Sequence, residues 1–286
     1  MVSLNRCCKN PKYRYTPISY CRQLSLCTLN CKLLKDLAPM LGKIFKRFRK
    51  IDDDIIIAHA SPLAVPTLIG VVGDVHGCAT LTGKLIDKLR DSHPDIKLLF
   101  VGDYIDRGEE SRQVIELLMG MPEVTCLMGN HERMCLDFLA EPEERGGRWL
   151  RNGGLQTVAS YGVAGSQTEL TKMRDALALA MGDKVINWLA ERPLHAKFGN
   201  LYAIHAGADP ARPIEEQGEK PLIWGHSLFK KQPRYDGHWV IHGHTIVDQP
   251  IVENGRISID TGAYATGRLT AAVINGADVQ FLQSHY

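Results

Sequence analysis

The sequence predicts an α/β fold with two β-sheets and helices outside them. Three short apolar runs, at 67–74, 96–103 and 123–130, are typical of buried strands, and helical segments separate them. This strand-helix-strand-helix-strand order favours parallel pairing of the three strands in one sheet. The C-terminal half returns to short strands, which indicates a second sheet.

Helical periodicity predicts the segments between these strands. Residues 79–91 place their apolar side chains on one helix face, and residues 111–121 form the second helix. Residues from about 132 to 195 are also predicted to be helical, and the last helix there ends at Pro193.

Four further strands are predicted in the second half, at 201–207, 238–244, 250–260 and 269–282. The last two contain Asn-Gly pairs, at 254–255 and 275–276. This dipeptide is a strong signal for a hairpin turn, so each of these two segments is expected to reverse direction.

Charge divides the chain into two parts. Residues 1–50 carry a formal charge of +11 and residues 51–286 carry −9, within a total of +2. We therefore predict a basic, cysteine-rich leader at 1–50 and one domain at 51–286. The leader is open to three interpretations: a targeting peptide, a basic interaction tail, or sequence upstream of a true start at Met40.

Residues 41–50 are predicted to form a short basic amphipathic helix. Their apolar side chains fall at helical spacing, with Lys and Arg between them. Such a helix makes weak contact with an anionic membrane or with another protein, or it covers the domain as a surface helix. No stretch of the chain approaches the roughly 18–20 apolar residues of a transmembrane helix.

The cysteines predict neither a disulfide framework nor a zinc module, because no Cys-x-x-Cys pair occurs. Cys78, Cys126 and Cys135 lie near apolar runs of the domain and are expected to be reduced, buried thiols. This usage is typical of an intracellular enzyme and predicts a cytoplasmic location.

Residues that can bind metal ions follow five of the predicted strands. In chain order they are Asp74, His76, Asp103, Asn130, His131, His205 and His244. The carboxyl ends of parallel strands are where ligands gather, and buried carboxylates are costly unless a cation compensates them. A simple turn would explain one such strand end but not five, so we predict a metal site.

These residues resemble the motifs of the calcineurin-like metallophosphoesterases, and more narrowly of the phosphoprotein phosphatases, including bacterial Ser/Thr protein phosphatases. "GDVHG", "GDYIDRG" and "GNHE" match the three family motifs in order, and "HAG" and "GHT" match the two later histidines. The resemblance extends over residues 66–275, and the stretch at 149–162 is similar to bacterial members. It implies a four-layer α-β-β-α sandwich with two mixed β-sheets flanked by helices.

The resemblance implies a site for two divalent metal ions. Asp74 and His76 would bind the first ion, and Asp103 would bridge both. The second ion would be bound by Asn130, His205 and His244. Such ligands suit Mn²⁺, Fe, Zn or Ni, and Mn²⁺ is the usual ion in bacterial relatives. The two ions would bind phosphate oxygens and hold a bridging hydroxide as the nucleophile.

The resemblance also implies catalytic residues. His131 would act as general acid on the leaving group, and Asp106 would hydrogen-bond His131 and favour its protonated form. Arg107 would bind phosphate oxygens as a bidentate donor. Alternation places His242 and His244 on the same strand face, and the GHT motif selects His244 as the ligand, with His242 supporting it.

One position departs from the family. Many bacterial relatives carry Trp-x-Arg-x-x-Phe, whose Arg binds phosphate, and here His226 takes the place of that Arg. We predict that His226 contributes to substrate binding, with less charge than Arg and no forked donor. Phosphate binding would then be weaker or more pH-dependent, or Lys230 or Arg234 would replace the missing Arg.

The predicted activity is metal-dependent hydrolysis of phosphomonoesters, with phosphoserine and phosphothreonine proteins as the family's usual substrates and small phosphoesters beside them. Hydrolysis of diadenosine tetraphosphate or another nucleotide anhydride is the second hypothesis, because those relatives share the core motifs. A phosphoprotein-binding protein with a degenerate site is the third, although every metal position is filled. No nucleic-acid partner is expected, since the domain is acidic and has no evident basic groove.

Overall fold

The computed structural model describes residues 61–165 and 168–286. The predicted leader at 1–50, its boundary with the domain and the helix at 41–50 lie outside the described residues. The described part falls within one compact unit, 56–286, and both sheets belong to it.

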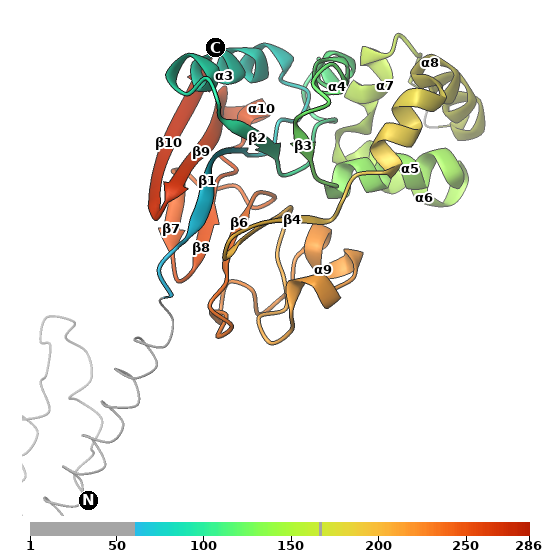
Figure 1. Cartoon of the computed structure of the whole chain (residues 1–286). Coiled ribbons are helices and arrows are strands. Elements are labelled where there is room, and N and C mark those ends of the chain that lie inside the picture. The colour runs from blue at the N-terminus through green and yellow to red at the C-terminus, as the bar shows by residue number, and fades with distance from the viewer. Residues whose placement is uncertain (1–60, 166–167) are drawn as a thin grey trace, which may run out of the picture. The chain divides into compact units, whose positions relative to one another are not determined.

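The first sheet has five strands in the order β10-β9-β1-β2-β3. Its parallel part consists of β1 (Val65–Val72), β2 (Lys97–Phe100) and β3 (Thr125–Cys126), as the apolar runs predicted. The hairpin of β9 (Arg268–Gly276) and β10 (Asp278–His285) adds antiparallel strands beside β1, so the sheet is mixed. Figure 1 shows this sheet from the red C-terminal strands across to the green β3.

Helices cover one face of the first sheet. α3 (Ala79–Ser92) buries Leu81, Leu85 and Leu89 in the same apolar cluster as Val72 of β1. A fully buried leucine contributes about 1.5–3 kcal/mol, so this stripe fixes the helix on the sheet. Among the other helices that contribute to the cluster are α4 (Ser111–Met119), α5 (Asn130–Ala140), α6 (Pro142–Trp149), α7 (Leu155–Ser160) and α8 (Leu170–Ala190).

The second sheet also has five strands, in the order β4-β5-β6-β8-β7. They are β4 (His195–Phe198), β5 (Leu201–Ile204), β6 (Trp239–His242), β7 (Ile251–Glu253) and β8 (Arg256–Ser258). β5, β6 and β8 run parallel, whereas β4 and β7 pair antiparallel at the two edges. The residues between β7 and β8 are the predicted Asn-Gly pair, and Asn254 has a φ of 48°, as such turns require.

The two sheets pack face to face over an apolar interior. Ile69 and Val71 of β1 point into it, as do Ile241 of β6 and Ile257 of β8. Val72, on the opposite face of β1, belongs to the helical side. This alternation follows from the two-residue period of a strand, and it explains why β1 is apolar along its buried length.

The outer face of the second sheet is covered by α9 (Glu219–Trp224). Leu222 and Ile223 of this helix share a buried cluster with Tyr202 and Val240 of the sheet. The layers are therefore helix, sheet, sheet and helix, which confirms the predicted four-layer sandwich with two mixed sheets.

The three parallel strands end earlier than predicted. The expected limits were residues 74, 103 and 130, but the strands end at Val72, Phe100 and Cys126. Gly102 and Asp103 have φ values of 113° and 54°, which a strand cannot accommodate. The residues of the candidate site consequently follow the strands and do not lie on them: most are in loops, whereas Asn130 and His131 begin α5.

The predicted helical region at 132–195 is interrupted. It divides into α5, α6, α7 and α8, and a π-helical turn at Leu150–Gly154 joins α6 to α7. Gly153 has a φ of 104° there, and a side chain at this position would lie 2.7 Å from the backbone nitrogen of Arg107. The break therefore allows this turn to approach the loop that carries Arg107.

Sequence periodicity missed three short elements. β4 has no alternating pattern of burial, and α9 and α10 (Ala263–Thr266) have only six and four residues. Elements of this size carry too few residues for a period to emerge. They form because the neighbouring strands and loops hold them in place.

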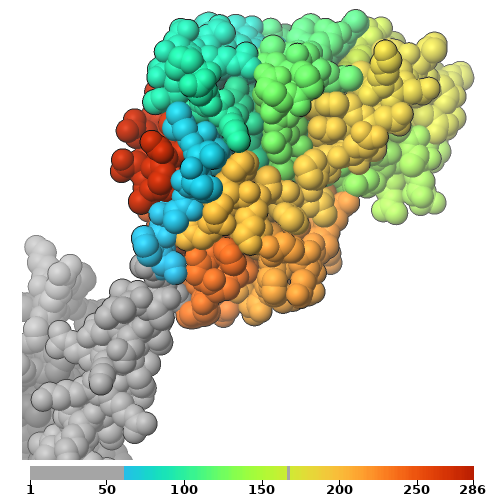
Figure 2. Space-filling view, in the orientation of Figure 1, coloured from blue at the N-terminus to red at the C-terminus, as the bar shows by residue number. Residues whose placement is uncertain are grey.

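β4 nevertheless helps to join the two sheets. Asn200, which follows β4, donates to the carbonyl of Pro62 at 2.9 Å and accepts from the N–H of Ala64 at 2.7 Å. The chain that enters β1 is therefore tied to the second sheet. Figure 2 shows the blue start of β1 lying against the gold surface around β4.

The cysteines of the described part, Cys78, Cys126 and Cys135, are all buried and free, as predicted. Within residues 61–165 and 168–286, no helix combines the length and the apolar character needed to cross a bilayer. The cytoplasmic location stays a prediction.

Candidate active site

The predicted ligands come together where loops and the start of α5 meet, and Asp103 lies among them. Two groups share this residue. The first group is His76, Asp103 and His131, and the second is Asp103, His205 and His244. Within each group the candidate ligand atoms lie within 4.8 Å of one another. Asp103 is thus the residue that the two groups share, and its role as a bridging ligand stays a prediction.

Buried hydrogen bonds orient His76 toward Asp103. The Nδ1 atom of His76 donates to the carbonyl of Ile105 at 3.0 Å, which leaves Nε2 without a proton, 3.5 Å from Oδ2 of Asp103. Burial lowers the pKa of His76 to about 3, so the ring is neutral at neutral pH. A neutral imidazole whose other nitrogen is fixed by a carbonyl is the form that binds metal ions.

The second group brings several lone pairs together. Nδ1 of His205 donates to the carbonyl of Val101 at 3.1 Å, and burial lowers the pKa of His205 to about 4, so Nε2 carries no proton. This Nε2 faces Oδ1 of Asn130 at 2.9 Å and Oδ1 of Asp103 at 3.3 Å. Nδ1 of His244 lies 2.8 Å from the same Asn130 oxygen. Nε2 of His205 and the oxygens of Asn130 and Asp103 are acceptors that repel one another unless a cation lies between them, so these residues fit a divalent ion.

The carboxylate of Asp103 is surrounded by imidazoles. Burial alone would raise its pKa, but His205, His131 and His76 hold the pKa of Asp103 below its usual range. Its Oδ1 also accepts from the backbone N–H of His131 at 3.0 Å. The group is therefore ionised and supplies negative charge to both ligand groups.

Asp74 lies beside these two groups and not within them. Both of its carboxylate oxygens accept from the backbone N–H of His244, at 3.1 and 3.0 Å. Burial raises the pKa of Asp74, and the neighbouring carboxyl groups of Asp260 and Asp103 raise it further. The assignment of Asp74 to the first ion stays a prediction.

Asp260 is a buried neighbour of Asp74 that sequence reasoning missed. Burial raises the pKa of Asp260 to about 6, and its Oδ1 accepts from the N–H of Gly262 at 2.8 Å. It follows β8 by two residues, so the signal that selected the other candidates, an acidic residue after a strand, would have found it.

His131 is held by Asp106, as predicted. Nδ1 of His131 donates to Oδ2 of Asp106 at 2.7 Å. Burial alone would lower the pKa of His131, but the charge of Asp103 and the hydrogen bond and charge of Asp106 raise it. The imidazole therefore holds a proton more readily than a free histidine, as a general acid requires.

Two further donors hold Asp106, and sequence reasoning assigned no role to either. Nε1 of Trp149 donates to Oδ2 at 2.8 Å, and the Thr157 hydroxyl donates to Oδ1 at 2.6 Å. Burial raises the pKa of Asp106, but the carboxylate accepts three hydrogen bonds, which favour its ionised form. The proton between Asp106 and His131 therefore stays on Nδ1 of His131. Both residues belong to the stretch at 149–162, and its similarity to bacterial relatives was the available signal.

Replacing Asp106 with asparagine is expected to lower the pKa of His131, because the carboxylate raises it. The protonated form of His131 would then survive only to a lower pH. The alkaline limb of the kcat/KM profile should therefore move to lower pH, by on the order of one unit. The profile is measured with p-nitrophenyl phosphate, and an unmoved alkaline limb would show that Asp106 does not control this group.

Arg107 lies across the first ligand group. Its Nη1 donates to Nε2 of His76 and its Nη2 to Nε2 of His131, both at 3.0 Å. Its guanidinium carbon also lies 4.9 Å from the ring centre of Tyr264 on α10. The forked donor is therefore positioned to bind two oxygens of a phosphate group between the two histidines.

Glu132 connects the loops after β2 and β3, and no role was predicted for it. Its carboxylate accepts from the N–H groups of Asp103 and Tyr104, each at 2.8 Å, and of Gly129 at 3.0 Å. Burial raises the pKa of Glu132 to about 8, whereas these donors favour its ionised form. Its place in the GNHE motif was the available signal, and its contacts fix Asp103 relative to Asn130.

Five site residues hold a backbone conformation that favours glycine. They have φ values between 46° and 72° and are His76, Asp103, Asp106, Arg107 and His244. In the described part of the chain, the only other non-glycine residue of this kind is Asn254 in the β7–β8 turn. Such conformations cost about 1–3 kcal/mol each and concentrate where function requires one orientation of a side chain.

Two glycines allow the site loops to approach one another. A side chain at Gly243 would lie 1.9 Å from Oδ1 of Asp74. One at Gly129 would lie 2.3 Å from the backbone nitrogen of Asp103. Contacts this short leave no room for a Cβ atom, so the glycines of the GHT and GNHE motifs are required by packing.

His242 has both ring nitrogens engaged away from the ligand groups. Nδ1 lies 3.0 Å from the carbonyl of Gly243, and Nε2 lies 2.9 Å from the hydroxyl of Ser258. β6 ends at His242, and His244 has a φ of 62°, so strand alternation does not extend to His244. The motif, and not the alternation, selected the histidine that joins the second group.

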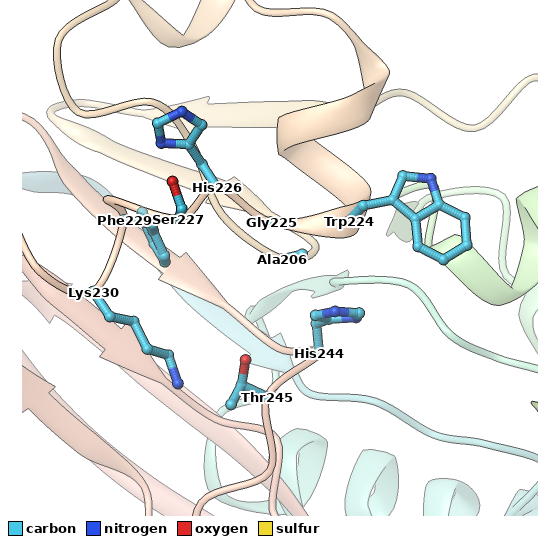
Figure 3. A pocket seen from close by; sticks show the side chains of 9 residues that line it. All are labelled: Ala206, Trp224, Gly225, His226, Ser227, Phe229, Lys230, His244 and Thr245. Carbon is cyan, nitrogen blue, oxygen red and sulfur yellow. The ribbon is translucent and has the colours of Figure 1, made fainter.

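A pocket of about 330 Å³ adjoins the second group, and His226, Lys230, His244 and Thr245 are among its lining residues. Figure 3 shows the ammonium group of Lys230 directed toward Thr245 and His244, whereas the imidazole of His226 is turned away from them. Burial, and with it the charges of His131, Arg107 and Lys230, lowers the pKa of His244. The binding role of His226 stays a prediction.

Arg234 is not among the lining residues of this pocket, and its charge is already paired. Its guanidinium pairs with Asp236 and donates to the carbonyls of Asp209 and Arg212, at 3.0 and 2.7 Å. These contacts hold two surface loops together. Of the two residues considered as replacements for the missing Arg, Lys230 is therefore the one that lines the pocket.

Known proteins resemble this chain in sequence and fold. A family model of calcineurin-like phosphoesterases matches residues 67–248. Serine/threonine-protein phosphatase 2 of Salmonella typhimurium is 32% identical over 213 residues, which cover 71% of this chain and 90% of that protein. Bis(5'-nucleosyl)-tetraphosphatase PrpE of Geobacillus sp. (strain WCH70) is 29% identical over 230 residues, which cover 71% of this chain and 89% of that protein.

A solved structure shares the fold. The cold-active protein-tyrosine phosphatase of a psychrophilic Shewanella species has a TM-score of 0.53 and 16% identity, covering 79% of this chain and 84% of that one. At this identity the likeness concerns the fold alone. The family model, in contrast, matches more than half of the sequence and includes the loops that carry the site. The chain therefore belongs to the calcineurin-like phosphoesterase family.

Proposed function

We propose that this chain is a divalent-metal-dependent hydrolase that transfers phosphoryl groups to water, with His131 as its general acid. One arrangement carries the proposal: Asp103 joins two ligand groups, and the His131–Asp106 pair lies against the first of them. The family supports the reaction class, and this geometry supports the role of each residue.

The side chains would divide the work as follows. Arg107 binds two phosphate oxygens through its forked donors beside His76 and His131. Once Arg107 binds the phosphate, Nε2 of His131 is free to carry a proton. His131, kept protonated by Asp106, then gives this proton to the leaving oxygen.

The metal ions would be held by the two ligand groups, with Asn130 and Asp74 beside them. When bound, two such ions polarise phosphate oxygens and lower the pKa of water, so that a nucleophile exists at neutral pH. We propose Mn²⁺, because carboxylate, amide and imidazole donors suit it. The three cysteines of the described part lie outside both groups, so no thiolate there favours a softer ion.

Two substrate classes are candidates for this site. Hydrolysis of phosphoserine and phosphothreonine in proteins is supported by the similarity to serine/threonine-protein phosphatase 2. Cleavage of bis(5'-nucleosyl) tetraphosphates is supported by several relatives that bear this activity in their names. The two classes differ in what adjoins the phosphate that is cleaved.

A substrate panel on the full chain tests the proposal. A phosphothreonine peptide, bis(5'-adenosyl) tetraphosphate and p-nitrophenyl phosphate are each supplied with Mn²⁺ and, as a control, with a chelator. We expect Mn²⁺-dependent release of phosphate or nucleotide from at least one of them. No turnover with Mn²⁺, Fe²⁺, Zn²⁺ or Ni²⁺, together with no bound ion by metal analysis, would instead favour a phosphoprotein-binding protein with a degenerate site.

Replacing Lys230 with alanine is expected to raise KM about tenfold and to change kcat less, because a hydrogen bond to the charged phosphate is lost. Lys231→Ala is the matched control, since Lys231 is exposed and does not line the pocket. Steady-state kinetics with p-nitrophenyl phosphate measures both constants. A rise in KM for His226→Ala but not for Lys230→Ala would return the binding role to His226.

A further inference from the structure

A second pocket, of about 400 Å³, lies beside Arg107. Its lining residues are Arg107, Arg151, Asn152, Gly153, Gln156 and Tyr264. Arg107 therefore has two neighbourhoods: its guanidinium contacts the first ligand group, and the residue also lines this pocket, which we call the Arg151 pocket. The proposed reaction uses only the first of these contacts.

The position of the Arg151 pocket relative to the ligand groups is fixed. The backbone N–H of Arg107 donates to the carbonyl of Gly153 at 3.2 Å, which ties the turn at Leu150–Gly154 to the Arg107 loop. The ring of Tyr264 lies 5.3 Å from the ring of His76. A group bound beside Arg151 would therefore adjoin the phosphate that Arg107 holds.

Arg151 carries a charge that no neighbour compensates. Its exposed side chain forms no hydrogen bond or ion pair with any residue that the structure describes, whereas Arg145, also exposed, pairs with Glu141. Arg107 and Arg151 both line this pocket, and their like charges repel each other. An anion that contacts both removes this repulsion and gains charge-assisted hydrogen bonds from both.

The remaining lining of the Arg151 pocket suits a nucleotide better than a peptide. Tyr264 is 38% exposed and lines the pocket, and an aromatic side chain is a group on which a base can stack. Asn152 and Gln156 are exposed amides, which can donate to and accept from base or sugar groups. A phosphoserine side chain, in contrast, carries one phosphate and gives Arg151 no anion to bind.

We propose that the Arg151 pocket binds the second phosphate of a nucleoside polyphosphate while Arg107 holds the adjoining phosphate for cleavage. This inference rests on the proposed hydrolase function and names its substrate class. Arg151 acts as a binding residue for the part of the substrate that is not cleaved. Of the two candidate classes, it selects the nucleotide anhydride over the phosphoprotein.

The test compares Arg151→Ala with Arg145→Ala, a matched loss of one exposed Arg from the adjoining helix. Each variant is assayed in Mn²⁺ with bis(5'-adenosyl) tetraphosphate and with p-nitrophenyl phosphate. Arg151→Ala should reduce kcat/KM for the tetraphosphate about tenfold more than for p-nitrophenyl phosphate, since only the tetraphosphate presents a second anion. Arg145→Ala should leave the ratio of the two values unchanged, and Arg151→Lys should restore part of it, because charge remains without the fork.

Equal losses for both substrates, or no loss, would overturn the inference. A selective loss with a phosphothreonine peptide that carries an acidic neighbour, but not with the tetraphosphate, would overturn it as well. If the unaltered chain hydrolysed neither substrate, the proposed function would be wrong. Titration calorimetry would then still show whether the Arg151 pocket binds the tetraphosphate. Binding of the tetraphosphate with Mn²⁺ should weaken when Arg151→Ala is added to His131→Asn, and equal affinity would overturn the assignment.

Discussion

Replacing His131 with asparagine is expected to reduce kcat by about 10²- to 10⁴-fold, the usual contribution of a general acid. Asparagine cannot deliver a proton to the leaving oxygen, but it can still fill the space beside Asp106. The variant should keep its full content of bound metal. Steady-state kinetics with p-nitrophenyl phosphate and metal analysis of the same sample measure both results.

The metal analysis is the decisive half of this experiment. Nε2 of His131 lies 3.9 Å from Oδ2 of Asp103, so geometry alone also allows it to be a ligand of the first ion. Loss of one ion from His131→Asn would identify it as a ligand, and the general-acid assignment would be wrong. His285→Asn is the control, because His285 is exposed and lies at the end of β10.

Replacing Asp103 with asparagine is expected to have a larger effect, because this carboxylate belongs to both ligand groups. The amide has no charge to balance two divalent ions. We expect bound metal to fall from about two ions per chain to below one, and kcat/KM to fall by about 10³-fold or more.

Thermal unfolding gives an independent measure of the same loss. A ligand that binds only the folded state stabilises it, so Mn²⁺ should raise the Tm of the unaltered chain. That rise should disappear in Asp103→Asn and persist in Asp87→Asn, which changes an exposed residue of α3. An Asp103→Asn variant that retains the Mn²⁺-dependent rise would contradict a bridging role.

The fold was predictable where residues repeat with a period. β1 and α3 are long enough to display an apolar face, and the Asn-Gly pair at 254–255 encodes its own turn. β4 and α10 have no such internal signal, because their positions depend on contacts with other elements. The interruption of the helical region at Leu150–Gly154 was not predicted for a similar reason. It accommodates the Arg107 loop, which is distant in the sequence.

The candidate site was predictable as a set of residue types and less so as a geometry. Asp103, His205 and His244 lie close enough to hold one ion, and their assignment as ligands stays a prediction. The residues that orient the site were not identified, because a buried carboxylate such as Glu132 or a donor such as Trp149 acts through other side chains. In the sequence alone, nothing distinguishes these residues from others that are buried for packing.

The direction of the Lys230 side chain also could not be predicted from the spacing of residues in the sequence. The sequence placed His226 at the position of a phosphate-binding Arg, and four residues later the chain supplies a cation to the same pocket. Whether a side chain turns toward or away from a pocket depends on the local backbone, which no periodic pattern describes. Figure 3 shows the two side chains taking opposite directions.

The left-handed backbone at five site residues sets stability and activity against each other. A glycine at His76, Asp103 or His244 would relax its loop, and it would also remove the side chain on which catalysis depends. A selection for heat resistance without bound metal would therefore act against these side chains. Selection for turnover, or for the stability that bound metal adds, retains them, so a laboratory programme that stabilises the metal-free chain must hold these five positions constant.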